Sequence, residues 1–573
     1  MSTPKKNILL LIADDLGKNL GCYGANVQTP NIDELAAQGV RYSHAFTSTA
    51  SCSNSRSVIY TGLHTHQNGQ YGLANKKHHF VIFDDVKTSP AFFRERGYLT
   101  ALIGKVHVGP AASFPWEHRW ESGTRDVAWV ADQAGAIFQQ ARDSDRPFFL
   151  TVGYIDPHRD MTRSGFGNED KFDERIKDVR YEPSDVEIPL FINNIEETRF
   201  EFSEYYRSIS RLDQGVGLIL QKLEAAGLAD DTLVVFLSDN GPPFLNSKTT
   251  LYDAGICLPF IVRKPGSAVK NIVNPNMVSY VDIFPTFQDW TNTTEHSPEG
   301  LAGQSFLPIH ERTDLVPESE WKHHIFGSHT FHEVTNYWPT RILRTRRYKY
   351  HRNVAWRLDF PFAADLYGSL AWDGIRHSQP LGSEKEIMVG PRKLQDYIFR
   401  PPEELYDLEA DPQEVVNLAK DPQYKDLLLS HRAKLEEWQD KTQDPWLYRD
   451  GVTGSTGAYV ANIGNKSAYS GASYLSAIQA AIDGTFSGAR IAVIASGFIG
   501  SNSIIIDAGK TFEGCGTIDA SFKNFKGAIE IIDVDDVHIP YLTLNGNPYN
   551  GIRISGTNGL QLGQITMVMS ATP

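Results

Sequence analysis

Cysteine is scarce in this chain. Only four occur among 573 residues, at positions spread from Cys22 and Cys52 through Cys257 to Cys515. A small disulfide-stabilised scaffold needs a dense framework of cysteines, so the sequence excludes that class of protein. We expect all four to be free thiols.

Long apolar runs and an excess of basic charge are also missing. The first apolar run, residues 8–13, spans six residues, which is too short for a signal-peptide core or a membrane span. The chain as written is therefore expected to stay in the cytosol, unless a leader is missing from it. Acidic residues outnumber basic ones by 69 to 55, giving a formal charge of −14. This charge argues against nucleic acid and anionic membranes as partners, although it allows a local basic pocket for an anionic substrate.

The composition that remains is typical of a large globular protein. Hydrophobic residues make up 41% of the chain and charged residues 22%, unlike the composition of a disordered protein. A chain of 573 residues exceeds what one hydrophobic core usually serves, so we expect two or three domains. Changes in composition predict that they cover residues 1–311, 312–450 and 451–573.

Four segments of the first domain share one pattern, in which a β-rich apolar run ends abruptly in polar residues. The runs are residues 8–13, 99–103, 148–154 and 233–237. Continuous apolar runs indicate strands that are buried on both faces, as in a parallel sheet covered by helices. Helical segments such as 31–38 and 205–226 supply the crossovers. The first domain is therefore predicted to be an α/β domain.

Polar residues that follow these strands are candidates for a common site. They are Asp14 and Asp15, Lys105 and His107, Asp156 and His158, and Asp239 and Asn240. Because ligands of open α/β sheets lie beyond the carboxyl ends of the strands, we expect these residues to face one crevice. The carboxylates of Asp14, Asp15 and Asp239 and the amide of Asn240 form a hard oxygen set, which suits Ca²⁺ or Mg²⁺ better than zinc.

The two remaining domains have different patterns. Residues 312–450 contain short aromatic and basic runs, such as TRILRTRRYKY at 340–350, and an amphipathic helix near 424–439, which indicate a smaller α+β subdomain. Residues 451–573 are rich in Gly, Ser, Ile and Asn, and segments 529–544 and 552–567 align at an offset of 23. This period resembles the coils of a right-handed parallel β-helix, as in the pectin-lyase group. We therefore predict a short β-helix-like tail.

Residues 51–62, SCSNSRSVIYTG, carry the most specific motif. They resemble the signature of the type I sulfatases, Cys-x-Pro-Ser-Arg followed by Thr-Gly, whose cysteine is oxidised to formylglycine. The positions that fit are Cys52, Ser55, Arg56, Thr61 and Gly62. Asn54 stands where the family has proline, and this departure bears on the oxidation. Residues 404–418, ELYDLEADPQEVVNL, resemble the carboxy-terminal subdomain of the same family.

The resemblance implies a fold, a cofactor and a set of roles. The fold would be an alkaline-phosphatase-like sheet flanked by helices, and the metal would be one Ca²⁺ ion, with Mg²⁺ as the alternative. Its ligands would be Asp14, Asp15, Asp239, Asn240 and the formylglycine made from Cys52. The hydrated aldehyde would attack sulfur and later release sulfate. Arg56 would hold the aldehyde, Lys105 and Lys248 would grip the sulfate, His107 would act as a base, and His158 would protonate the leaving group.

Five further runs resemble one branch of this family, the sulfamidases. They are residues 62–73, 103–110, 146–159, 211–220 and 331–341. This resemblance implies a sulfohydrolase of glycosaminoglycan degradation that releases sulfate from N-sulfated glucosamine. The candidates for binding that sugar are Asp156, Arg159, His332 and Glu333.

Several alternatives and partners stay open at this stage. The chain could instead be a sulfate-ester sulfatase, a phosphoester hydrolase of the alkaline phosphatase superfamily, or an inactive protein that binds sulfated glycans. The expected partners are a sulfated sugar and, for maturation, a formylglycine-generating enzyme. Similar enzymes are often dimers, so a homodimer is considered, although no interface is evident in the sequence.

Overall fold

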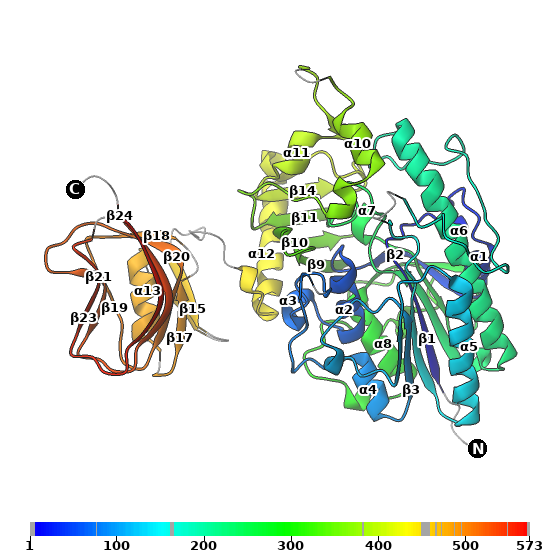
Figure 1. Cartoon of the computed structure of the whole chain (residues 1–573), viewed down its shortest axis with the longest axis horizontal. Helices are drawn as coiled ribbons and strands as arrows, with labels where there is room; N and C mark the ends of the chain where they lie inside the picture. Colours follow the sequence, from blue (N-terminus) through cyan, green and yellow to red (C-terminus); the bar gives the residue numbers. More distant parts are fainter. Residues whose placement is uncertain are drawn as a thin grey trace. The chain divides into compact units, whose positions relative to one another are not determined.

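A computed structural model of the chain describes residues 6–75, 77–160, 165–380, 383–447, 459–463, 467–471, 473–485, 487–493, 496–546 and 548–569. The chain forms two compact units, Met1–Asp444 and Pro445–Pro573 (Figure 1). The predicted boundary at residue 312 stays a prediction, and the one at residue 450 falls outside the described residues. Among these residues, no helix is both long and apolar enough to cross a membrane. Cys22, Cys52 and Cys257 are free thiols, as expected.

A large sheet forms the centre of the first unit. Its strands, in spatial order, are β4 (His118–Glu121), β3 (Leu99–Gly104), β5 (Phe148–Gly153), β1 (Asn7–Ala13), β6 (Thr232–Ser238), β7 (Phe260–Arg263), β2 (Val40–Phe46) and β8 (Ile272–Ser279). The four predicted strands are β3, β5, β1 and β6, which are neighbours and run parallel. The sheet is mixed, because β7 runs antiparallel to both β6 and β2.

Both faces of this sheet are buried, as the apolar runs predict. Successive residues of β1 enter different cores: Leu9 and Leu11 pack on one side, and Leu10 and Ile12 on the other. Helices α1 (Pro30–Gln38), α5 (Val127–Asp143) and α6 (Glu196–Ala225) cover the first face (Figure 1). Helices α2 (Cys52–Thr61), α4 (Ser89–Glu95) and α8 (Ile283–Trp290) cover the second. The carboxyl ends of the parallel strands are thereby left at one edge of the layer.

A second, antiparallel sheet completes the first unit. Its strand order is β14 (Glu403–Asp407), β11 (Tyr348–Asn353), β10 (Tyr337–Thr345) and β9 (His324–Phe331). Helix α12 (Lys425–Lys441) packs on it through Leu428, Leu435 and Trp438. The predicted amphipathic helix and the Glu-Leu-Tyr-Asp strand are both present in this layer. Short helices α9 (Ala364–Tyr367), α10 (Leu370–Arg376) and α11 (Leu394–Ile398) lie between β11 and β14 in the chain.

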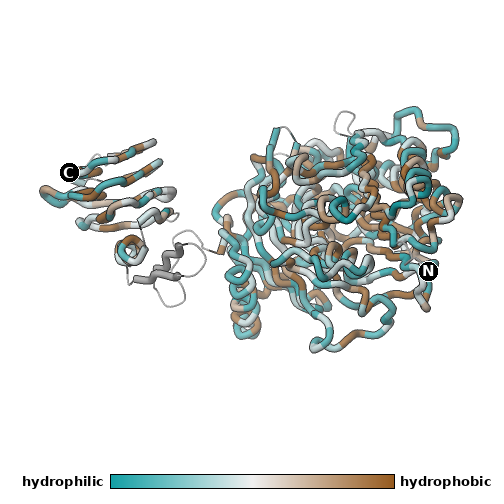
Figure 2. Tube along the Cα trace, turned by 90° about the horizontal axis from the view of Figure 1, so that it is seen from below, coloured by the Kyte–Doolittle hydropathy of each residue, from teal (hydrophilic) through white to brown (hydrophobic). Residues whose placement is uncertain are grey.

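The second unit is built from short parallel strands stacked one above another (Figure 2). One sheet contains β17 (Arg490–Val493), β20 (Thr511–Ala520), β22 (His538–Gly546) and β24 (Gln561–Met569), with β18 (Gly497–Gly500) beside β20. The other contains β19 (Ile504–Ile505), β21 (Gly527–Ile532) and β23 (Asn550–Ser555). Helix α13 (Tyr474–Asp483) packs against the same apolar core. The strands β15 (Tyr459–Ile463) and β16 (Ser467–Gly471) pair antiparallel.

The 23-residue repeat seen in the sequence reappears as strand register. Ile531 pairs with Ile554, and Leu542 with Ile565. Each pair repeats at the predicted offset, so equivalent residues of successive coils lie in register. The assignment of this unit to the pectin-lyase group stays a prediction.

Candidate active site

The ends of strands β1 and β6 bring four polar residues together. The two strands pair in parallel with Ala13 opposite Ser238, so Asp14 and Asp15 lie beside Asp239 and Asn240. All four residues are fully buried. The Asn240 amide donates to Asp15 Oδ1 at 2.7 Å, and the Asp15 backbone N–H donates to Asp239 Oδ1 at 3.2 Å.

Cys52 reaches the same point from the first residue of α2. Its Sγ lies 3.9 Å from Asp15 Oδ1. One candidate ligand atom from each of Cys52, Asp14, Asp15 and Asp239 lies within 4.8 Å of the others. Burial raises the pKa of the Cys52 thiol well above its ordinary value, so the unmodified side chain is a neutral thiol.

Two oxygens of this cluster fit a bound cation. Asp14 Oδ1 and Asn240 Oδ1 are buried and accept no hydrogen bond, although buried acceptors in proteins nearly always have a partner. Burial and the neighbouring Asp14 carboxylate also raise the pKa of Asp239 to about 7. A hard divalent cation would satisfy the free oxygens and would favour ionisation of all three carboxylates.

Two cations, Arg56 and Lys105, contact these carboxylates. Arg56, one turn after Cys52 on α2, donates from Nε to Asp239 Oδ2 at 2.8 Å. The Lys105 ammonium, which follows strand β3, forms an ion pair with Asp14. Burial alone would raise the pKa of Asp14, but the charges of Lys105 and Arg56 hold it well below its ordinary value. Asp14 therefore stays ionised.

A second group of charges surrounds Lys248. Its Nζ lies 2.8 Å from Asp15 Oδ2, 2.5 Å from Asp365 Oδ2 and 3.2 Å from His158 Nε2. Burial alone would lower the pKa of Lys248, but the two carboxylates raise it well above its ordinary value. Burial and the Lys248 charge lower the pKa of His158. Lys248 is thus a fixed cation beside a neutral imidazole.

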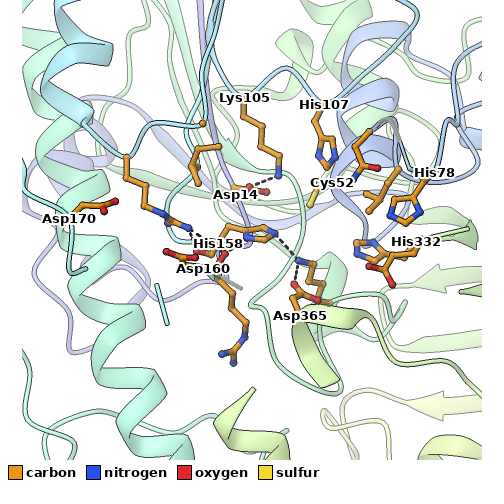
Figure 3. Close-up of a pocket in the computed structure, with 18 residues that line it drawn as sticks. Asp14, Cys52, His78, Lys105, His107, His158, Asp160, Asp170, His332 and Asp365 are labelled. Atoms are coloured by element: carbon orange, nitrogen blue, oxygen red, sulfur yellow. Dashed lines mark hydrogen bonds and ion pairs between the residues drawn. The ribbon is translucent and has the colours of Figure 1, made fainter. Parts of the chain in front are cut away.

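His107 and His332 lie near Cys52 in the same close-up (Figure 3). His107 Nδ1 is buried without a hydrogen-bond partner, and burial, with the nearby Lys105, lowers the pKa of the ring well below its ordinary value. His332 shares a 2.9 Å hydrogen bond between Nδ1 and Ser51 Oγ. Both rings, in their neutral state, are therefore suited to exchanging protons with a ligand.

Cys52, Asp14 and the lysine and histidine side chains described above line one pocket of about 510 Å³ (Figure 3). Its lining residues are Asp14, Cys52, Leu73, Asn75, His78, Lys105, His107, Gly123, Arg125, Ile155, His158, Arg159, Asp160, Asp170, Lys248, His332, Glu333 and Asp365. A volume of this size accommodates a single sugar ring with its substituents. The candidate nucleophile and the cations beside it therefore face one cavity.

The residues predicted to bind the sugar lie in different surroundings. His332 and Glu333 line the pocket. Asp156 is absent from the lining, because its carboxylate accepts hydrogen bonds from Arg125 at 2.6 Å and from Arg211 at 2.7 Å. Arg159 lines the pocket, but its guanidinium is bound by both carboxylate oxygens of Glu201 at 2.5 and 2.7 Å. The structure thus gives Asp156 and Arg159 structural contacts in the pocket wall.

Sequence reasoning missed several lining residues. Asp365 comes from α9, in the segment predicted to be the smaller α+β subdomain, and it contacts Lys248. Arg125 precedes α5 and carries no recognisable motif. His78 accepts a hydrogen bond at Nδ1 from the backbone N–H of Val334. No spacing in the sequence would have identified these residues, since each joins the pocket only through the packing of distant segments.

The chain is similar to a known family and to several known proteins. Residues 6–293 match the model of the Sulfatase family. The human N-sulphoglucosamine sulphohydrolase is 37% identical over 478 residues, which cover 78% of this chain and 92% of the human protein.

Two solved structures share the fold. One, from a study titled as glycosaminoglycan metabolism by Bacteroides thetaiotaomicron, has a TM-score of 0.58 at 17% identity and covers 77% of this chain and 98% of its own. Another, titled as a complex with its substrate D-glucosamine-2-N,6-O-disulfate, has a TM-score of 0.55 at 19% identity and covers 77% of this chain and 99% of its own. The alkaline-phosphatase-like fold expected from the sequence is thereby confirmed.

Proposed function

This chain belongs to the sulfatase family, and from that premise we propose that it releases sulfate from the nitrogen of a terminal N-sulfated glucosamine. The observation that carries the proposal is the 37% identity to the human N-sulphoglucosamine sulphohydrolase, which extends over 92% of that protein. Membership of the family makes the chain a hydrolase of sulfate esters or sulfamates. The choice of the sulfamate among these substrates is the proposed step.

The metal of the site is proposed to be one Ca²⁺ ion. Asp14, Asp15, Asp239 and Asn240 would hold it, because all four are buried together and two of their oxygens lack a donor. Oxygen ligands of this kind suit calcium and magnesium, whereas zinc prefers nitrogen and sulfur. The bound ion would withdraw charge from the sulfate oxygens, and formylglycine would supply the attacking oxygen.

Formylglycine is proposed to arise from Cys52 by the action of a formylglycine-generating enzyme. Asn54, where the family has proline, fits within α2: its Oδ1 accepts from Ser51 Oγ at 3.1 Å and its Nδ2 donates to Phe331 O at 3.3 Å. These contacts support Asn54 as a residue that the folded helix accommodates. Mass spectrometry of the peptide that contains Cys52 tests the oxidation, because an unmodified thiol would contradict it.

The remaining side chains are proposed to bind and orient the sulfamate. Lys105 and Lys248 are the cations that face the pocket beside Cys52, so they would pair with sulfate oxygens. His107 would accept a proton from the nucleophile. His158 would give a proton to the departing nitrogen, since an amine leaves only when it is protonated. Asp365 would keep Lys248 in place.

A pair of substrates tests the proposal. We expect the oxidised enzyme to release sulfate from a chromogenic N-sulfoglucosaminide with a kcat/KM well above that for an aryl sulfate. The Cys52→Ala variant is the control, and it should release none from either compound. Turnover of the ester alone would refute the sulfamate assignment while leaving the family intact.

A further inference from the structure

An aromatic cluster lies exposed on the second unit, far along the chain from the pocket. Phe522, Phe525 and Tyr549 are 56%, 67% and 46% exposed. The Tyr549 ring centroid lies 5.7 Å from that of Phe522 and 5.6 Å from that of Phe525. None of the three belongs to the apolar core of this unit. They therefore make one continuous aromatic surface that the fold does not use for its own packing.

The strand register explains why these rings meet. Phe522 and Phe525 precede β21, and Tyr549 precedes β23, and the two strands pair in parallel from Gly527 and Asn550 onward. The rings thus stand at the same end of neighbouring coils. Phe525 also has a φ of 59°, a left-handed conformation that is unusual for a bulky residue. Such a conformation is energetically unfavourable for a side chain with a Cβ, and it is often associated with function.

Charge is divided between the two ends of these strands. At the aromatic end lie Lys523 and Lys526. The guanidinium of Arg553, from the middle of β23, reaches the same end and donates to the Phe525 carbonyl at 3.0 Å. Glu530 pairs with Lys526 at 3.1 Å and with Arg553 at 3.4 Å. At the opposite end, β21 leads into the acidic residues Asp533, Asp535 and Asp536. The six residues of β21 separate the two ends by about 20 Å. The aromatic surface is therefore basic, although the chain as a whole is acidic.

We propose that this surface, formed by Phe522, Phe525, Tyr549, Lys523, Lys526 and Arg553, is a binding site for a sulfated polysaccharide. Exposed rings offer flat apolar faces to the C–H faces of sugar rings. The adjacent ammonium and guanidinium groups would pair with sulfate groups along the chain. The site binds and does not cleave, so it goes beyond the proposed function. It would hold the polymer while a separate pocket processes its terminus.

Retention on immobilised heparin, with salt elution, tests the proposal on the full-length protein. We expect the chain to be retained, and the triple variant Phe522→Ala, Phe525→Ala, Tyr549→Ala to elute at clearly lower salt with about tenfold weaker binding. The matched control is Phe498→Ala, which removes an aromatic residue that is 63% exposed in β18 of the same unit. This control should elute like the parent chain.

A second variant separates the contribution of charge. Lys523→Glu leaves every ring in place and should also lower the salt needed for elution. Weak retention of the parent on fully desulfated heparin is expected as well. Unchanged retention of either variant on heparin, or equal retention on the desulfated polymer, would overturn the proposal.

The test is independent of catalysis. Release of sulfate from a monosaccharide substrate should be equal in the parent and in the triple variant, because the pocket is untouched. Should the parent release no sulfate at all, the heparin result still decides the fate of the binding site. Failure of the proposed function and failure of this inference are therefore distinguishable.

Discussion

Two buried charge clusters lie close together in the first unit. They differ in whether all of their buried oxygens accept hydrogen bonds. Around Asp156, both carboxylate oxygens are occupied by Arg125 and Arg211, and Arg211 also donates to Asn168. Around Asp14, in contrast, buried oxygens of Asp14 and Asn240 have no donor. A cluster whose buried oxygens all accept hydrogen bonds is complete without a ligand. A cluster whose buried oxygens lack donors is incomplete and is arranged for a ligand. We therefore interpret the first as scaffold and the second as the catalytic centre.

The sharpest test of this comparison is removal of the nucleophile. Cys52→Ala should reduce sulfate release by about 10⁴-fold or more, because no other group would attack sulfur. Sulfate release in a steady-state assay measures the loss. Cys257→Ser, which alters a free thiol away from the pocket, is the matched control. Comparable loss in both variants would show that cysteine replacement harms the protein in general.

The incomplete cluster should respond in function more than in stability. Asp239→Asn should lower kcat/KM by more than about 10²-fold, because it would remove one of the proposed ligands of the ion. The free energy of unfolding of the metal-free protein should fall less than it does in Asp156→Asn, since burial and Asp14 raise the pKa of Asp239 to about 7 and the amide oxygen of the variant can still accept from Arg56 Nε. Calcium titration and urea unfolding measure the two effects. Tight calcium binding by the variant would contradict this assignment.

The complete cluster should respond in stability instead. Asp156→Asn leaves Arg125 and Arg211 buried beside a neutral partner, which should lower the free energy of unfolding by about 3 kcal/mol. Urea unfolding of the metal-free protein measures the change. Calcium affinity of the folded variant should stay near that of the parent. A variant with parental stability and lost calcium binding would reverse the roles of the two clusters.

Asp365 connects the catalytic centre to the smaller subdomain. Asp365→Asn should lower kcat/KM by about tenfold, because Lys248 would keep only one of its two carboxylate partners. Exposed Asp373, in α10, provides the matched control as Asp373→Asn. Equal kcat/KM in the parent and in Asp365→Asn would show that Asp15 alone fixes Lys248.

A histidine remote from both clusters should affect stability only at acidic pH. His310 is fully buried, shares a 3.1 Å hydrogen bond with Tyr42, and has a pKa lowered by burial to about 4. Its ordinary pKa is about 6.5, so the unfolded chain takes up a proton before the folded one does. Stability should therefore be full above pH 6.5 and fall as the pH drops towards 4, by at most about 3 kcal/mol for this group. Urea unfolding of the parent and of His310→Gln at pH 7.5 and 4.5 measures this loss. An equal change in the free energy of unfolding of the two proteins between these pH values would contradict the prediction.

Much of this architecture could be predicted from local sequence. The runs that became β1, β3, β5 and β6 are apolar throughout, so burial on both faces and a common strand edge followed directly. The 23-residue repeat likewise predicted the register of β21 with β23. Such patterns are local, and each is visible within a few residues.

The surroundings of individual side chains could not be predicted in this way. Asp156 follows a strand like Asp14 does, yet Arg125, just before α5, and Arg211, from α6, occupy both of its oxygens. Asp365 reaches Lys248 across 117 positions of the chain. Whether an acid at a strand end faces a ligand or an arginine depends on helix packing, which no spacing in the sequence encodes.

The most direct test of the account is a crystal structure grown with calcium, with anomalous scattering used to locate the ion. We predict one anomalous peak per chain between Asp14, Asp15, Asp239 and Asn240, at about 2.3–2.6 Å from their oxygens. The side chain of residue 52 should face it. A map without a peak there, or with the ion bound elsewhere in the first unit, would contradict the central claim.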